Sequence, residues 1–229
     1  LNTIKTVNSS FTPTPGQNNM IAWWQRSTGV SMGGSLPYGV TLWSDQSGNA
    51  YHMTQRTVIQ QPEGAGNIGQ NNGEVWFDPA NVSNFVIPQI TVSGDFTIAM
   101  QIKVFNVGGC LLSDNDDVGE FMKLTSTTQL RMKFNNGGAL NVGLDSGTWT
   151  DGDITNLIVT RSGSTINMWR NGVEQSTNAN SSEDFKIDNF GIRRTNLNPF
   201  DGWLSDCSIY NETSTSLTSG LINYLTSIQ

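Results

Sequence analysis

Hydrophobic and polar residues alternate along most of the chain with a period of two, the pattern of β-strands that bury one face. In residues 151–172, two alternating runs flank the pair Ser162-Gly163, and Asn171-Gly172 follows the second run. Such pairs tolerate the positive φ angles of tight hairpin turns. The segment therefore predicts a β-hairpin of two antiparallel strands, followed by a second tight turn.

The same alternation predicts further strands on both sides of this hairpin. Residues 95–104 alternate most regularly, with Phe96 and Ile98 on the side expected to be buried and Thr97 and Gln101 on a much wetter side. Residues 20–24 fit either a strand or a single helical turn. The other predicted strands lie at 40–42, 74–78, 111–112, 121–124, 129–134, 140–144, 189–193 and 203–210. Leucine and isoleucine then recur at helical spacing and predict an amphipathic helix over 216–227.

About a dozen short strands with turn residues between them indicate two antiparallel sheets packed face to face. The fold class expected is an all-β jelly-roll sandwich with a short C-terminal helix. At 229 residues, we expect one domain over 18–229. Residues 1–17 contain two prolines and little periodicity, and they predict an arm that becomes ordered by packing on something else, often a neighbouring subunit.

Charge and composition exclude several classes of partner. The net charge is −7, whereas binding a nucleic-acid backbone requires clustered Lys and Arg. Arg193-Arg194 is the nearest approach to such a cluster, and we interpret it as a solvated pair. No apolar run of about 18 residues predicts a membrane span. Residues 1–17 show no signal peptide, but a processed chain would look the same, so the sequence leaves secretion open.

The sequence offers few groups for catalysis. His52 is the only histidine, and it follows the polar turn 44–49, where a structural hydrogen-bonding role is expected. The chain contains neither a G-x-S-x-G nucleophile motif nor a pair of metal-binding histidines. We therefore predict a protein that is not an enzyme.

Carboxylates gather in the segment 114–120, which makes it the candidate metal site. Calcium prefers six to eight oxygen ligands, and the candidates here are Asp114, Asp116, Asp117 and Glu120. The segment fails the EF-hand pattern, because Thr125 stands where a bidentate Glu is needed. The alternative is a solvated acidic loop, which this departure favours.

Tryptophans and cysteines complete the candidate residues. Exposed aromatic rings stack on sugar rings, and among seven tryptophans we select Trp149, in a loop, and Trp169, in the hairpin. We expect most of the other five to pack in the core or under loops. Cys110 and Cys207 lie in apolar contexts that favour buried thiols, and a disulfide stays open because it depends on whether their strands are neighbours.

Several ordered fragments resemble a known family. They are the segments V-T-L-W-S-D-Q-S-G-N at 40–49, S-G-D-F-T-I at 93–98, the hairpin with Arg161 that ends in M-W-R-N-G at 168–172, and G-W-L-S-D-C-S-I-Y-N at 202–211. In this order they are similar to the concanavalin-like, laminin-G-like jelly-roll domains of bacterial and phage proteins. Trp169 replaces the tyrosine that is usual in the hairpin motif.

This resemblance implies a jelly roll and several functions, since one fold hosts unrelated activities. The first expectation is a non-catalytic virion or surface protein, whose arm and rim loops bind a capsid, a tail or a second copy, with a location on a virion surface or outside the cell. The alternative is a carbohydrate-binding module that binds polysaccharide, with calcium as an optional cofactor. A glycoside hydrolase ranks last, because the E-x-D-x-x-E motif of related glucanases is missing.

Overall fold

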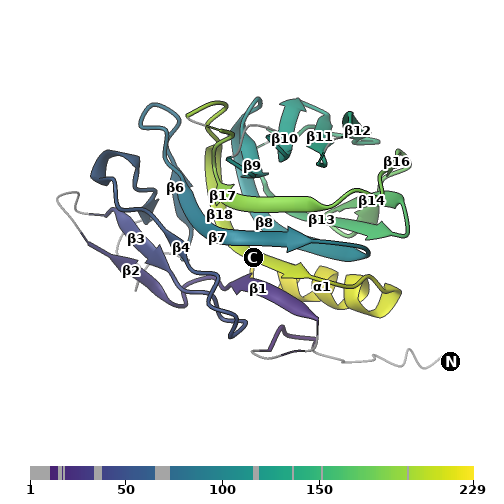
Figure 1. Cartoon of the computed structure of the whole chain (residues 1–229), viewed down its shortest axis with the longest axis horizontal. Helices are drawn as coiled ribbons and strands as arrows, with labels where there is room; N and C mark the ends of the chain where they lie inside the picture. Colours follow the sequence, from purple (N-terminus) through teal and green to yellow (C-terminus); the bar gives the residue numbers. More distant parts are fainter. Residues whose placement is uncertain are drawn as a thin grey trace, which may run out of the picture.

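Two antiparallel sheets, packed face to face, form the protein (Figure 1). The computed structural model describes residues 11–14, 17, 19–33, 38–64, 73–115, 119–135, 137–150, 152–194 and 196–229. This architecture confirms the predicted all-β jelly-roll sandwich. No helix in these residues is long and apolar enough to span a membrane.

The first sheet contains the predicted hairpin. Its strands, in spatial order, are β15 (Val173–Glu174), β14 (Thr165–Arg170), β13 (Ile154–Ser162), β8 (Phe96–Asn106), β18 (Asp201–Tyr210), β6 (Val75–Phe77) and β5 (Glu63–Gly64). In addition, β1 (Met20–Trp24) pairs with β18, and β16 (Ala179–Asn180) pairs with β14.

The second sheet contains, at one end, the three strands predicted at 121–124, 129–134 and 140–144. Its order is β12 (Ala139–Gly143), β11 (Gln129–Lys133), β10 (Phe121–Ser126), β9 (Cys110–Ser113), β17 (Phe185–Phe190), β7 (Phe85–Val92), β4 (Met53–Thr54), β3 (Val40–Trp43) and β2 (Val30–Met32). A short 3-10 helix, η1 (Val58–Gln60), and the helix α1 (Thr215–Ser227) complete the elements.

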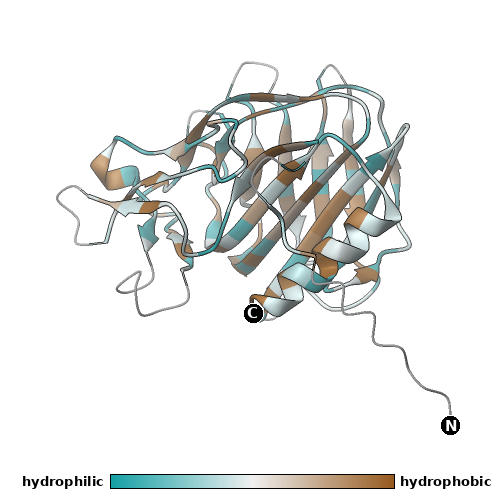
Figure 2. Ribbon diagram, turned by 90° about the horizontal axis from the view of Figure 1, so that it is seen from below, coloured by the Kyte–Doolittle hydropathy of each residue, from teal (hydrophilic) through white to brown (hydrophobic). Residues whose placement is uncertain are grey.

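Helix α1 confirms the predicted C-terminal helix and lies on the outer face of the first sheet (Figure 2). Ser214 caps it, because the Ser214 hydroxyl oxygen accepts a hydrogen bond of 3.1 Å from the Leu217 amide. Its buried side chains, Leu217, Leu221, Tyr224 and Leu225, pack against Trp23, Ala99, Ile158 and Tyr210 of the sheet.

This helix corrects the expectation for β8. Thr97, Ala99 and Gln101 were expected on the wetter side of the strand, but all three are 0% exposed. Gln101 donates hydrogen bonds to the Asn156 side chain and to the Leu225 carbonyl of α1. The alternation predicted the two faces of the strand correctly, but it could not show that the second face is covered by a helix.

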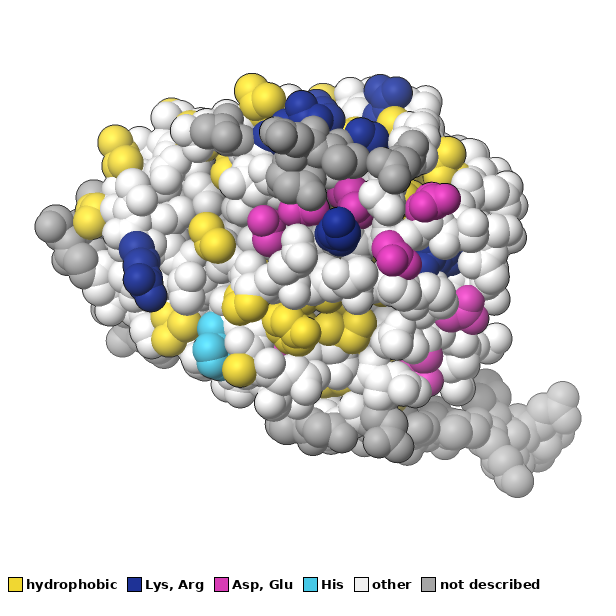
Figure 3. Space-filling model, viewed as in Figure 1, with side chains coloured by type: hydrophobic (Ala, Val, Ile, Leu, Met, Phe, Trp, Pro, Cys, Tyr) yellow, Lys and Arg dark blue, Asp and Glu magenta, His cyan; other side chains and the backbone are white. Residues whose placement is uncertain are grey.

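The outer face of the second sheet is open in the view of Figure 3. Basic side chains gather at its upper edge, over β10 and β11, and acidic side chains lie below them. Lys123 on β10 and Arg131 on β11 lie directly opposite each other, and both point away from the core because the neighbouring Met122, Leu124, Leu130 and Met132 point inwards.

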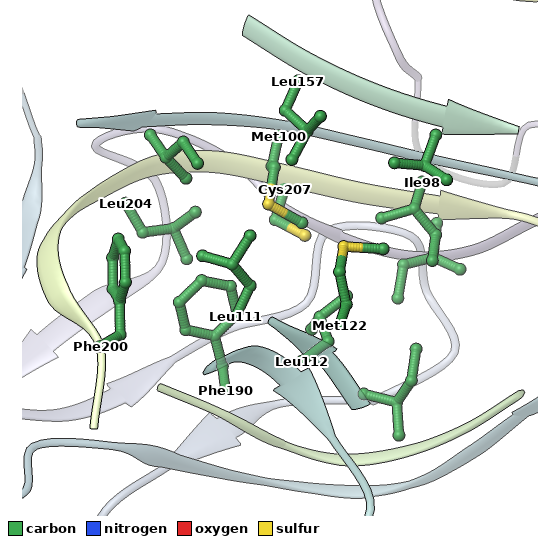
Figure 4. Packing of buried hydrophobic residues seen from close by; sticks show 14 of the residues in the cluster. Ile98, Met100, Leu111, Leu112, Met122, Leu157, Phe190, Phe200, Leu204 and Cys207 are labelled. Carbon is green, nitrogen blue, oxygen red and sulfur yellow. The ribbon is translucent and has the colours of Figure 1, made fainter. Parts of the chain in front are cut away.

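The core fills the space between the sheets (Figure 4). From the first sheet, Ile98, Met100, Leu157 and Cys207 point inwards, and Phe200 packs just before β18. From the second sheet, Leu111, Leu112, Met122 and Phe190 meet them. Alternate residues of each strand therefore form one continuous apolar layer.

Several strands differ from the sequence-based expectation, and the short strands β2, β4, β5, β15 and β16 were not predicted. β7 was not predicted, because Pro88 interrupts its hydrophobic pattern; the pairing of β7 with β17 shifts register there, between the pairs Ile187↔Ile90 and Asn189↔Val86. The strand expected at 189–193 is displaced, since β17 covers Phe185–Phe190 and stops before Gly191. Gly191 has a φ of 96°, a conformation that other residues rarely adopt.

Candidate functional site

The outer face of the first sheet carries the exposed aromatic side chains. Cross-strand partners share a face, and one row across this face runs Glu63, Trp76, Trp203, Lys103 and Ile154. Helix α1 covers the neighbouring rows but not this one. Two areas therefore stay accessible, one beside the start of α1 and one beyond its C-terminal end.

The first area is a groove of about 380 Å³ between the hairpin and helix α1. Half-buried Trp169 of β14 forms one wall, next to Ile222 of the helix. Polar groups form the rest, with Glu174, Asn167 and the hydroxyls of Thr160, Ser162, Thr213, Ser214, Thr215, Thr218 and Ser219. An aromatic wall among hydroxyl, amide and carboxylate groups suits a ligand that presents both C–H and O–H groups.

The second area is an aromatic strip, defined here as Trp76, Trp203 and Phe105. The rings of Trp76 and Trp203 have centroids 6.2 Å apart and planes inclined by 34°, and Phe105 meets Trp203 edge-on at 6.5 Å. Both tryptophans are half-buried and Phe105 is 39% exposed. The strip therefore presents three neighbouring, partly exposed aromatic rings on this face.

A polar groove of about 610 Å³ adjoins this strip. Lys103 belongs to both, because it lines the groove and its ammonium lies 5.8 Å from the centre of the Phe105 ring. Asp153, Asn156, Asn171 and Gln229 provide further polar groups, and Ile154 provides an apolar one. A ligand lying on the strip can therefore reach hydrogen-bonding groups at its end.

Trp149 does not present a ring face to solvent. Its side chain is 0% exposed and belongs to the core, although it lies in a loop as expected, with its amide donating to the Thr127 carbonyl. The choice of Trp149 as a stacking residue is therefore corrected. Most of the other five tryptophans were expected to pack in the core or under loops, and Trp23, Trp24 and Trp43 are at most 2% exposed. Trp76 and Trp203 lie half-buried on the outer face. The strand alternation contained this signal, since Val75 and Phe77 flank Trp76 and both point inwards.

The acidic segment 114–120 is only partly described, since Asp116 and Asp117 lie outside the described residues. Asp114 and Glu120 are each 1% exposed, and the Glu120 carboxylate accepts a hydrogen bond of 2.5 Å from the Lys186 amide. A side chain on Gly119 would collide with the Arg194 guanidinium, so a cation already lies against the loop. Within the described part of the chain, no three His, Cys, Asp or Glu side chains group as metal ligands. The calcium site stays a prediction.

The motif around His52 has a structural role. Asp45 accepts hydrogen bonds from the amides of Trp23, Ser47 and Tyr51, at 2.8 to 3.0 Å. The His52 Nδ1 accepts one from the Asp45 amide at 3.1 Å. The W-x-D-Q-S-G-N turn therefore connects β1 to the loop after β3 through hydrogen bonds, and its polar residues stabilise the fold.

A buried polar network lies beneath the C-terminal half of α1. Asp206 is 0% exposed and accepts hydrogen bonds from the Tyr224 hydroxyl at 2.8 Å, the Arg26 amide at 3.2 Å and the Trp23 indole at 3.3 Å. Burial raises the pKa of Asp206 to about 7, although these hydrogen bonds oppose the rise. The network connects helix α1 to the first sheet, and these two elements form the walls of the two grooves.

The chain is similar in sequence to a known protein family. The family model described as the concanavalin A-like lectin/glucanases superfamily matches residues 78–217, more than half of the chain. No curated protein sequence matches the chain.

Solved structures share the fold at low sequence identity. Botulinum neurotoxin type C, whose cell entry depends on interaction with two ganglioside molecules, is 12% identical with a TM-score of 0.60, and the match covers 92% of this chain and 51% of the toxin chain. Domain 4 of an extracellular arabinanase from Geobacillus stearothermophilus, in complex with arabinotriose, is 14% identical with a TM-score of 0.57, and the match covers 92% and 98%. Trypanosoma rangeli sialidase is 9% identical with a TM-score of 0.53, and the match covers 91% of this chain and 33% of that chain. This chain thus spans about half and a third of the toxin and sialidase chains.

Proposed function

The chain belongs to the concanavalin A-like lectin/glucanase superfamily, and we propose that it is a carbohydrate-binding module that binds glycans on the outer face of its first sheet. One observation carries this proposal: four of the seven tryptophans are at most 2% exposed, and the other three, Trp76, Trp169 and Trp203, all lie half-buried on that face. Packing accounts for the first four. It does not explain why the exposed rings share one face.

The chemistry of that face suits sugars better than a protein partner. The core of a protein interface is depleted of charged residues, whereas here Glu174 lies in the groove with Trp169, and Lys103 adjoins the aromatic strip. A pyranose ring presents axial C–H bonds to an aromatic face and hydroxyls to its surroundings. Similar solved structures include domains in complex with arabinotriose and with N-acetylneuraminic acid, which supports this class of ligand.

We propose that binding proceeds without hydrolysis. The sequence lacks the E-x-D-x-x-E motif, and the one histidine, His52, is engaged with the Asp45 amide. If incubation with the polysaccharides that bind released reducing sugar, this part of the proposal would be wrong.

A panel of soluble neutral polysaccharides tests the proposal, read by affinity electrophoresis and calorimetry. Ser219→Tyr fills the Trp169 groove from an exposed position of α1, and Asn223→Tyr adds the same side chain one turn further along, outside the groove lining. We expect Ser219→Tyr to weaken binding and Asn223→Tyr to leave it unchanged. Addition of calcium to the same assay tests the segment 114–120. If none of the polysaccharides in the panel binds, the proposal is wrong.

A second proposal concerns attachment to a larger assembly on a virion or cell surface. Phe11 packs against α1 and Pro13 is buried, which supports the arm as an anchored segment. We propose that residues 1–17 and the rim loops bind a capsid, a tail or a second copy. Deleting residues 1–10 should abolish co-sedimentation with assembled particles and retain glycan binding; unchanged co-sedimentation would refute this role.

A further inference from the structure

Three cations lie together on the outer face of the second sheet, on the opposite side of the molecule from the aromatic strip. Lys123 and Arg131 are direct cross-strand partners on β10 and β11. Arg193, which follows β17, lies over the Phe121 ring, with its guanidinium carbon 4.2 Å from the ring centre. Phe121 precedes Lys123 by two residues and so shares its face. Figure 3 shows that basic side chains gather at the upper edge of this face, over β10 and β11.

This placement costs stability. Like charges directly opposite each other on neighbouring strands repel, and natural sheets usually avoid them. The pKa of Lys123 is lowered, first by burial and then by Arg193 and Arg131. The pKa of Arg193 is lowered in the same way, first by burial and then by Arg194 and Arg131. The fold thus holds together positive charges that disfavour one another.

In the part of the chain that the structure describes, no ion pair joins a carboxylate to any of these three cations. Among the described residues, the one ion pair is Arg26 with Glu74, far away on the other sheet, and none involves Lys123, Arg131 or Arg193. The Nε of Arg193 is buried and has no hydrogen-bond partner within the same residues. A local arrangement that breaks a rule of sheet pairing without internal compensation is typical of a binding site.

We propose that Lys123, Arg131 and Arg193 form a second binding site, which takes a carboxylate or sulfate group of an acidic polysaccharide. The planar guanidinium groups of Arg131 and Arg193 can each donate two parallel hydrogen bonds to an oxyanion. The Phe121 ring fixes the orientation of Arg193 in advance, and Lys123 adds a point charge between them. A bound anion relieves the repulsion that the free protein carries.

The surroundings favour a polysaccharide over a nucleic acid. Asp188 of β17 points outwards on the same sheet, and the whole chain carries a net charge of −7. A nucleic-acid strand carries one charge about every 3.4 Å and would bring further phosphates against this acidic surface. A polysaccharide with one anionic group per repeating unit can place a single anion among the three cations.

The test measures binding of polygalacturonate, which carries carboxylates, and dextran sulfate, which carries sulfate esters, with uncharged dextran as the reference polymer. Arg131→Gln and Arg193→Gln should each weaken binding of a charged polymer at least tenfold. Arg56→Gln removes one exposed positive charge outside the site, and it should change binding less than twofold. Stability gives an independent readout: Arg131→Gln should raise the melting temperature while it removes binding, because it relieves the repulsion.

Three results would overturn this site. One is binding of both charged polymers no tighter than binding of dextran. Another is unchanged affinity in Arg131→Gln and Arg193→Gln. The last is tighter binding of a double-stranded DNA oligonucleotide than of either acidic polymer. Because Arg131→Gln leaves the outer face of the first sheet intact, neutral-glycan binding there can fail or succeed separately.

Discussion

Trp203 and Trp76 lie directly opposite each other on β18 and β6, with ring centroids 6.2 Å apart and planes inclined by 34°. Both rings are half-buried on the outer face of the first sheet, where a ligand can reach them. The two neighbouring rings therefore form one accessible aromatic surface. This relationship leads to the first prediction.

Replacing Trp203 with Ala should weaken neutral-glycan binding by about 1–2 kcal/mol, or roughly five- to thirty-fold. Trp203→Phe keeps an aromatic face and should lose much less. Calorimetric titration measures both. Leu197→Ala, at a side chain that is 52% exposed outside the strip, serves as the control. Equal affinities for Trp203→Ala and the control would exclude the strip from binding.

Asp206 should make stability depend on pH. Burial raises its pKa from 3.8 to about 7, so the folded state holds the proton more tightly than the unfolded state. The contribution of this group to stability is therefore complete below pH about 4 and is lost as the pH rises to about 7. The loss is on the order of 4 kcal/mol.

Asp206→Asn removes this titration. The difference in unfolding free energy between the variant and the natural protein should shift in favour of the variant as the pH rises from 4 to 8. Urea unfolding at several pH values measures it. A difference that stays constant with pH would show that Asp206 ionises with an ordinary pKa.

Gly220 and Phe11 should be energetically coupled. A side chain on Gly220 would lie 2.5 Å from the Phe11 ring, so Gly220→Ala must displace the arm from helix α1. Phe11→Ala alone should cost about 1–2 kcal/mol of lost burial. In the Phe11→Ala background, Gly220→Ala should instead stabilise by about 0.5–1 kcal/mol, because alanine favours the helix. A double-mutant cycle measured by denaturant unfolding tests this, and strictly additive effects would contradict docking of the arm.

Cys110 and Cys207 should resist alkylation in the native state. Both are free thiols that are 0% exposed. Burial raises the pKa of Cys110 to about 12 and the pKa of Cys207 well above its ordinary value, so the reactive thiolate is scarce at pH 8. Iodoacetamide labelling followed by mass spectrometry should find neither residue modified until denaturant is added. Rapid native labelling would show that one strand opens readily.

Local alternation predicted the elements of the fold that depend on one segment. The hairpin β13–β14 followed from alternating runs around Ser162-Gly163, and α1 followed from the spacing of its leucines, because these signals lie within a few residues of each other. β7 was not predicted, because Pro88 interrupts the alternation of hydrophobic and polar residues in this strand. A shift in its pairing with β17, a strand about a hundred residues away, accommodates the proline.

The candidate site was harder to predict because it depends on what covers each sheet. Trp149 lies in a loop and looked exposed, but the loop folds inwards over the core. Trp76 and Trp203 belong to a group of five tryptophans of which most were expected to be buried, and the sequence did not show which of the five are accessible. They are accessible because α1 ends before it reaches their row. Sequence alternation assigns a side chain to a face, while the covering helix decides whether that face meets solvent. Of the two tryptophans selected from the sequence, Trp169 lines an accessible groove and Trp149 is buried.

The most direct test of glycan binding on the first sheet observes the tryptophans themselves. In a ¹⁵N-labelled sample, the indole N–H groups give one signal each, which single Trp→Phe variants assign. Titration with arabinotriose and with cello-, xylo- and malto-hexaose should shift the signals of Trp76, Trp169 or Trp203 and leave those of Trp23, Trp24, Trp43 and Trp149 in place. If none of these sugars shifts any of the three half-buried tryptophans, the outer face of the first sheet does not bind them and the central claim is contradicted.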